Sequence, residues 1–171
     1  NSQRNIETYA YTIIDSYETF DIRQYEASLF TSVEIPSNNY RETSSKGFSI
    51  LAGYIFGAND KEEKIAMTSP VAMSLKDSTT MLFLVPNKYT RDNLPTPNDS
   101  SIEFKNIPEK RVAAISFGGW ASDSKIASFK KKLIAALNTK GIQHTDNFYF
   151  LGYNAPMEVF NRKNEIIVEL K

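Results

Sequence analysis

The chain has 171 residues, of which 41% are hydrophobic and 23% are charged, and its 20 basic and 20 acidic residues give no net charge. This length and balance are typical of one globular domain with a sizeable core, and they exclude a disordered chain. Zero net charge excludes the basic field that nucleic-acid binding requires, and the absence of cysteine excludes disulfides, thiolate chemistry and cysteine-ligated metal clusters.

The first half of the chain begins with a polar stretch and predicted strands. Residues 1–10 are expected to be loosely held, because they are polar. The strands that follow are predicted at residues 11–17, as an edge strand, and at residues 20–22 and 29–35.

A helix is predicted over residues 39–56. Its apolar side chains fall at i, i+3, i+4 and i+7 and form one stripe: Phe48, Leu51, Ala52 and Ile55. The expected N-cap is Ser37 or Asn38, and Gly57 is expected to end the helix.

Gly47 and Gly53 each weaken this helix by about 1 kcal/mol relative to alanine. Two explanations stay open for these small residues. They allow the helix to approach a sheet closely, which is the commoner reason, or they leave room for a flat ligand.

A strand over residues 71–75 follows a charged loop. Pro70 stands at its start, because proline cannot donate to a sheet ladder. Val71 and Met73 share one face of this strand with Leu75, and Met67 and Met73 suit an adaptable apolar wall. A second strand is predicted at residues 81–85.

The second half of the chain repeats the plan of the first. A surface connection that contains prolines is predicted at residues 86–99, and strands follow at residues 102–104 and 112–117. A helix comes next, with Ser122 as its N-cap and Gly141 after its end. Two closing strands are predicted at residues 148–153 and 165–170. Two βαββ-like halves, at about residues 11–86 and 100–171, predict an α+β fold. We expect a pseudo-twofold, curled, barrel-like antiparallel sheet with both helices packed outside.

Enzymatic chemistry has little support in the sequence. His144 is the only histidine, and its polar neighbours predict a surface turn. No nucleophile-elbow, dinucleotide or phosphate-loop motif occurs, and one histidine cannot begin a metal site, so we expect neither an enzyme nor a metal centre.

The segment 161–165 reads as a polar turn before the last strand. We expect Glu165 to pair there with Arg162. As an alternative, Arg162 and Lys163 offer cations to ligand carboxylates at the rim of a pocket. Trp120, which follows two glycines, is expected to cover the end of the sheet.

Six motifs in order and spacing resemble the SOUL or haem-binding-protein family. The clearest is KIAMTSPVAM at residues 64–73, and the others lie at residues 17–25, 53–59, 94–99, 117–121 and 152–165. The resemblance covers residues 11–170. It implies the same fold, and it implies that haem or another tetrapyrrole binds in an apolar groove beside the first helix.

The resemblance also implies which residues form this site. The groove would be built from Phe48, Leu51, Ala52, Ile55, Met67, Met157 and Phe160, with Arg162 as a cation at its rim. Basic residues of haem-binding relatives fall here at Ser45, Gly53 and Glu158, and the axial histidine that some relatives carry in an early strand is absent. We therefore expect weak binding without a histidine axial ligand, as in a carrier, buffer or sensor.

Other functions stay open beside this one. The groove could instead receive a partner protein or another hydrophobic small molecule, and a tetrapyrrole-modifying enzyme is the remaining alternative. No run of residues approaches the ~18 apolar positions of a membrane span. Because the chain begins at Asn1 rather than methionine, both a cytoplasmic location and tethering to the cell envelope by a preceding segment stay open.

Overall fold

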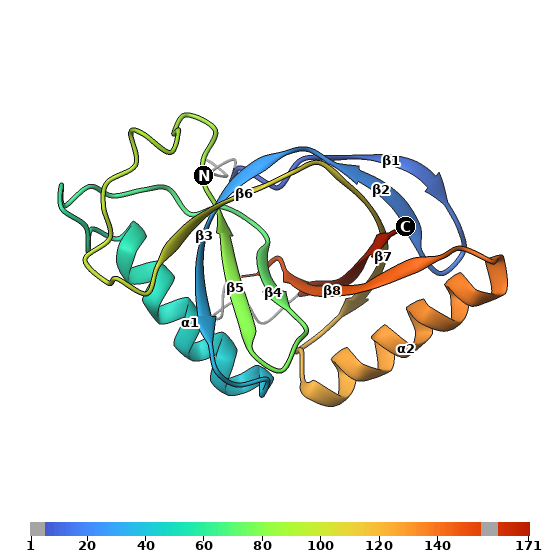
Figure 1. Cartoon of the computed structure of the whole chain (residues 1–171). Helices are drawn as coiled ribbons and strands as arrows, with labels where there is room; N and C mark the ends of the chain where they lie inside the picture. The colour runs from blue at the N-terminus through green and yellow to red at the C-terminus, as the bar shows by residue number, and fades with distance from the viewer. Residues whose placement is uncertain (1–5, 155–160) are drawn as a thin grey trace.

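The computed structural model describes residues 6–154 and 161–171, and within them the chain forms two helices and nine strands (Figure 1). The strands make one antiparallel sheet in the order β1-β2-β7-β9-β8-β4-β5-β3-β6. In chain order the elements are β1 (Tyr11–Ser16), β2 (Asp21–Tyr25), β3 (Ser28–Ile35), α1 (Tyr40–Ile55), β4 (Val71–Ser74), β5 (Thr79–Leu84), β6 (Glu103–Ile107), β7 (Lys110–Gly118), α2 (Asp123–Lys140), β8 (His144–Gly152) and β9 (Lys163–Leu170). The predicted α+β class is confirmed.

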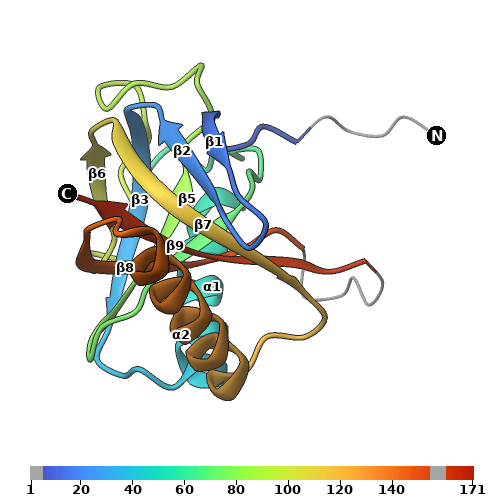
Figure 2. The same ribbon diagram turned by 90° about the vertical axis from the view of Figure 1, so that its right-hand side faces the viewer.

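The sheet curls into a half-barrel, and both helices lie on its outer face (Figures 1 and 2). Because side chains alternate along a strand, neighbouring residues of β9 serve different cores. Ile166 belongs to the outer core cluster with Leu51 of α1 and Leu133 of α2. Ile167 belongs to the inner cluster, which includes Tyr25. The sheet is therefore buried on both faces.

Apart from the edge strand β1, the sheet has a symmetric strand order. Exchanging β2–β5 with β6–β9 in that order gives the order read from the opposite end. The helices hold matching places, since α1 connects β3 to β4 and α2 connects β7 to β8. This order is compatible with two related halves, although the repeat itself stays a prediction.

The first helix begins one residue later than predicted, at Tyr40. Its N-cap is Asn39, whose side-chain oxygen accepts a hydrogen bond from the Glu42 amide at 3.0 Å. The predicted caps at Ser37 and Asn38 are therefore wrong, because Asn39 is the residue placed to satisfy this free amide. At the other end Gly57 follows the helix with φ of 119°, as expected for a residue that ends it.

The second helix has the predicted ends. The Ser122 hydroxyl accepts from the Lys125 amide at 3.2 Å, and Gly141 adopts the left-handed conformation with φ of 68°. The buried side chains of its apolar face are Ile126, Leu133 and Leu137. Neither helix of the described chain is long and apolar enough to cross a membrane.

The two glycines of α1 have different surroundings. A methyl group added at Gly47 would lie 3.0 Å from the Met81 sulfur, so the prediction of close approach to the sheet is confirmed there. A methyl group added at Gly53 would meet nothing within 4 Å, so close approach does not explain this residue.

Part of the segment that was expected to be loosely held is tied to the sheet. The Tyr9 amide donates to the Ser69 carbonyl at 3.0 Å, and the Ser69 amide donates to the Glu7 carbonyl at 3.0 Å. Tyr9 is buried and stacks on Tyr25 with ring centroids 4.2 Å apart. Likewise, the predicted surface connection at residues 86–99 carries Leu94 into the outer core, and Tyr89 packs against that core.

Candidate functional site

A cleft of about 510 Å³ lies beside the first half of α1. The helix contributes Tyr40, Ser44, Phe48 and the two further serines Ser45 and Ser49. Residues three and four apart share a helix face, so these side chains form one wall. Three of them are serines, and the Phe48 ring packs against Phe83 of β5, with ring centroids 5.5 Å apart.

The floor of the cleft is apolar and comes from three paired strands. Met73 of β4 is paired with Met81 of β5 on one side and with Phe150 of β8 on the other. Val71 is paired with Gly152, which has no side chain and so leaves space beside the valine. All five residues line the cleft. The antiparallel register therefore fixes an apolar surface at this point.

The rim of the cleft is positively charged. Among the described residues that line it, the charged side chains are Arg41 of α1 and Arg162, just before β9. The Arg162 guanidinium carbon lies 4.1 Å from the centroid of the Trp120 ring, a cation–π contact. Trp120 is 54% exposed at the cleft. It therefore lies at the mouth of the cleft, and the expectation that it covers the end of the sheet stays a prediction.

Hydrogen bonds hold this rim in place. The Asn164 side chain donates to the Gly119 carbonyl at 2.8 Å, and the Lys125 ammonium donates to the Gly118 carbonyl at 3.1 Å. Gly119 has φ of 78°, a conformation that favours glycine. The turn that carries Trp120 is therefore fixed between β9 and α2.

The residues of α1 that were predicted to build the groove have different surroundings in the structure. Phe48 and Arg162 line the cleft, as predicted. Leu51, Ala52 and Ile55 instead lie buried in the outer core, because the apolar stripe that they form faces the sheet and is filled by it. The cleft lies along the first half of the helix, beside its serine-rich face.

Met67, Met157 and Phe160 were also predicted to build the groove. Met67 is half-buried and packs against the outer core, outside the residues that line the cleft. Met157 and Phe160 lie outside the described residues, as does Glu158.

His144 lies in a strand and not in the predicted surface turn. It is the first residue of β8 and pairs with Leu170 of β9, so the strand begins four residues earlier than predicted. Its Nδ1 lies 2.7 Å from the Thr145 carbonyl oxygen. Leu170 lies four residues from Ile166, the β9 partner of Phe150, because β8 has a bulge after His144. The separation along the sheet is therefore roughly 13 Å. His144 is not among the described residues that line the cleft.

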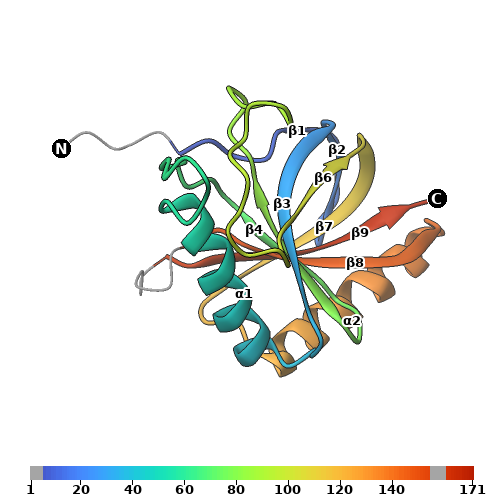
Figure 3. The ribbon, with the colours of Figure 1, turned by 60° about the vertical axis from the view of Figure 1, so that its left-hand side comes forward.

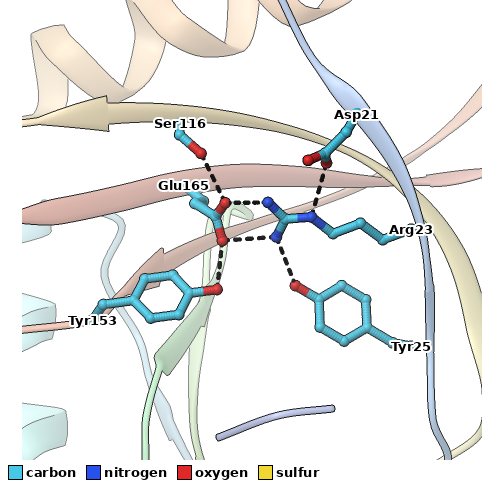
Figure 4. Close-up of polar contacts among 6 residues, drawn as sticks. All are labelled: Asp21, Arg23, Tyr25, Ser116, Tyr153 and Glu165. Atoms are coloured by element: carbon cyan, nitrogen blue, oxygen red, sulfur yellow. Dashed lines mark hydrogen bonds and ion pairs between the residues drawn. The ribbon is translucent and has the colours of Figure 1, made fainter. Parts of the chain in front are cut away.

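A buried polar network, which the sequence analysis missed, occupies the inner face of the sheet (Figure 4). Arg23 of β2 forms a two-point ion pair with Glu165 of β9, and one of its two hydrogen bonds measures 2.8 Å. Tyr153 and Ser116 also donate to the Glu165 carboxylate, and Arg23 donates to Tyr25 at 3.1 Å. The side chains of the ion pair are 4% and 0% exposed.

This network keeps Glu165 ionised. Burial raises the pKa of Glu165, but hydrogen bonds from Arg23 and Tyr153 outweigh burial and leave the pKa below its usual value. The predicted Glu165–Arg162 pair is wrong. Asn164 and Ile166 face the helices, so strand alternation directs Glu165 to the inner face. That alternation was the signal available in the sequence.

Comparison with known proteins agrees with the fold and with the sequence resemblance. The family model described as "SOUL heme-binding protein" matches residues 6–169. The chain is 30% identical over 155 residues to Heme-binding protein 1 of Xenopus laevis, with 86% of this chain and 81% of that protein covered. It is also 30% identical over 157 residues to human Heme-binding protein 2, with 86% and 76% covered.

Solved structures share the fold at low sequence identity. The C-terminal domain of EcmrR superposes with a TM-score of 0.69 at 12% identity, covering 94% of this chain and 98% of that domain. This likeness concerns the fold alone, whereas the family match extends over almost the whole chain. The chain belongs to the SOUL heme-binding protein family.

Proposed function

We propose that the cleft beside α1 binds haem or a related tetrapyrrole as a carrier, buffer or sensor, and that it does so weakly and without a histidine axial ligand. The observation that carries the proposal is the composition of the cleft. It combines an apolar floor with two arginines as the charged side chains of its described lining.

The size and floor of the cleft suit a flat apolar guest. Its volume of about 510 Å³ falls within the range of roughly 300–1,000 Å³ that is common for small-molecule pockets. Met73 and Met81 offer flexible thioethers, which adapt to an irregular guest. Phe150 and Phe48 provide aromatic surface. A porphyrin ring would replace water along this surface, so the hydrophobic effect favours its binding.

The charges at the rim suit the carboxylates of such a guest. A guanidinium matches the geometry of a carboxylate and makes charge-assisted hydrogen bonds with it. Arg41 and Arg162 flank the cleft, and the exposed Trp120 ring lies beside Arg162. When bound, haem would bring an apolar disc, two carboxylates and an iron with axial positions. In this proposal Arg41 and Arg162 hold the carboxylates and Trp120 covers the disc.

We expect weak affinity because Ser45 occupies a position where haem-binding relatives carry a basic residue. Ser45 lines the cleft, but its hydroxyl supplies no positive charge. A hydrogen bond to a charged group contributes about 1.5–3 kcal/mol, so its absence costs about tenfold or more in affinity. With His144 outside the described lining of the cleft, the proposed binding relies on packing and on the arginines.

Titration with haemin and with iron-free protoporphyrin IX tests this function. The Soret band reports haemin binding, and fluorescence quenching reports a guest near Trp120, which is the only tryptophan of the chain. We expect saturable binding of both ligands with one site, because the site does not depend on iron. Arg41→Gln and Arg162→Gln should each weaken binding about tenfold, whereas Lys131→Gln on α2 serves as a charge-matched control outside the cleft.

Two results would point to other functions. A flat response to both porphyrins at micromolar concentration contradicts tetrapyrrole binding and leaves a partner protein or another hydrophobic molecule as the occupant. Chemical conversion of the bound porphyrin during the titration, followed by its absorption spectrum, would instead identify an enzyme.

A further inference from the structure

A second hollow lies next to the cleft, between the starts of the two helices. It has a volume of about 230 Å³ and shares three lining residues with the cleft: Tyr40, Met73 and Phe150. Figures 1 and 3 show that α1 and α2 begin near one another below the sheet. The two hollows are therefore neighbours along one groove, and these three side chains lie at the boundary between them.

Tyr40 forms the wall at this boundary. Met73 and Phe150 belong to paired strands of the sheet and make the floor on both sides. The Tyr40 ring comes from the helix and meets the Phe150 ring nearly at right angles, with centroids 5.3 Å apart and an interplanar angle of 79°. A ring that spans from helix to floor at this point separates the two spaces.

The backbone of Tyr40 is fixed while its side chain remains only half-buried. Its amide donates to the carboxylate of Asp123, the first residue of α2, at 3.0 Å. Burial raises the pKa of the Tyr40 hydroxyl, and the nearby charge of Arg162 opposes that effect. Tyr40 lines both hollows and its ring contacts Phe150, so the ring lies at the boundary between them.

Charged side chains of both signs line the second hollow. Lys76 and Lys130 line it together with Asp77 and Asp123. The Asp123 carboxylate already accepts the Tyr40 amide, and the Lys130 ammonium lies 4.5 Å from the centroid of the Phe148 ring. A guest long enough to pass Tyr40 would meet these two lysines among the charged side chains of the second hollow.

We infer that Tyr40 sets the length of the ligand: its ring confines the guest to the cleft and so selects porphyrins with carboxylates on one edge over porphyrins with carboxylates on all sides. This inference rests on the proposed tetrapyrrole binding and adds the substrate class and the residue that selects it. Removal of the ring joins the two hollows, and a carboxylate on the far edge of the guest then reaches Lys130.

The test compares two iron-free porphyrins on the full chain. Protoporphyrin IX carries two carboxylates on one edge, and coproporphyrin III carries four around the ring. The wild type should bind protoporphyrin at least about tenfold more tightly, and Tyr40→Ala should shift the ratio of the two dissociation constants about tenfold toward coproporphyrin. Tyr40→Phe, which keeps the ring, should retain the wild-type ratio, and Tyr40→Leu replaces Tyr40→Ala if that variant does not fold.

A double variant tests the role of the second hollow. Lys130→Gln added to Tyr40→Ala should remove the gain for coproporphyrin, whereas the neighbouring Lys131→Gln should leave that gain intact. An unchanged ratio in Tyr40→Ala and Tyr40→Leu overturns the inference while protoporphyrin binding persists. A change of this ratio in Tyr40→Phe as large as in Tyr40→Ala also overturns the inference, because the hydroxyl and not the ring would then select between the two porphyrins. If the wild type binds neither porphyrin, the proposed function and this inference fall together.

Discussion

The ion pair between Arg23 and Glu165 offers the sharpest test of the energetics of the fold. Glu165→Gln keeps the size of the side chain and removes its charge. The guanidinium of Arg23, which is 3% exposed, would then remain buried with Asp21 as its remaining carboxylate partner. Tyr153 and Ser116 would lose a charged acceptor as well.

The expected cost of this change is large. Removal of one partner from a buried ion pair costs about 3–5 kcal/mol, because the other charge stays buried without compensation. Here Asp21 contacts Arg23 at 2.8 Å and offsets part of that cost, so we expect about 3 kcal/mol. Total stabilities of globular proteins are about 5–15 kcal/mol, so a loss of this size is easily measured.

Urea denaturation followed by circular dichroism gives the free energy of unfolding by linear extrapolation. Glu109→Gln is the matched control, because Glu109 is exposed in the loop between β6 and β7. The double variant Arg23→Met with Glu165→Met should cost much less than the sum of the single changes, since it leaves no buried charge. A loss below about 1 kcal/mol for Glu165→Gln, or strictly additive single and double effects, would refute this account of the network.

Three further predictions concern pH, packing and the ligand site. The pKa of Glu165 in the folded protein lies below its value in the unfolded chain, so its contribution to stability is present above about pH 4.3 and is lost as the pH falls. The difference in unfolding free energy between the wild type and Glu165→Gln should therefore shrink when denaturation is measured at progressively lower pH. A constant difference would contradict the direction of the pKa shift. Gly47→Val should destabilise the protein by about 1–3 kcal/mol, because the added side chain would collide with Met81. Gly53→Ala should stabilise it by about 1 kcal/mol, because alanine favours the helix and meets no neighbour there. Thermal or urea unfolding measures both changes, and equal effects would contradict the described packing. Ser45→Lys should tighten protoporphyrin binding about tenfold, whereas Gly53→Lys, outside the cleft lining, should not; the reverse order in fluorescence titrations would move the site along α1.

The helices and strands could be predicted because local signals determine them. Ser122 and Gly141 carry the side chain and the backbone freedom that the ends of α2 require, and both serve as predicted. The apolar stripe of α1 is likewise visible from its spacing, although the choice among neighbouring polar residues for its N-cap depends on backbone geometry. Asn39 and not Ser37 holds that place.

The candidate site was only partly predictable, because a stripe of apolar residues has the same spacing whether it lines a cleft or fills a core. Leu51 faces the sheet and is fully buried, while the cleft uses the less conspicuous serines on the neighbouring face. Glu165 shows a second limit of sequence analysis. Its partner Arg23 lies 142 residues away, and the two strands that carry the pair are brought close because β2 and β9 both pair with β7.

The central claim is that the cleft beside the first half of α1 is the tetrapyrrole site, and its most direct test is to fill that cleft. Ser45→Phe places a ring among the lining residues, and Ser128→Phe places the same ring on the exposed face of α2 as a control. Binding of protoporphyrin IX is measured by quenching of Trp120 fluorescence, with circular dichroism to establish that both variants fold. The account predicts that Ser45→Phe loses binding by at least about tenfold while Ser128→Phe binds like the wild type. Equal, undiminished binding by both variants would contradict it.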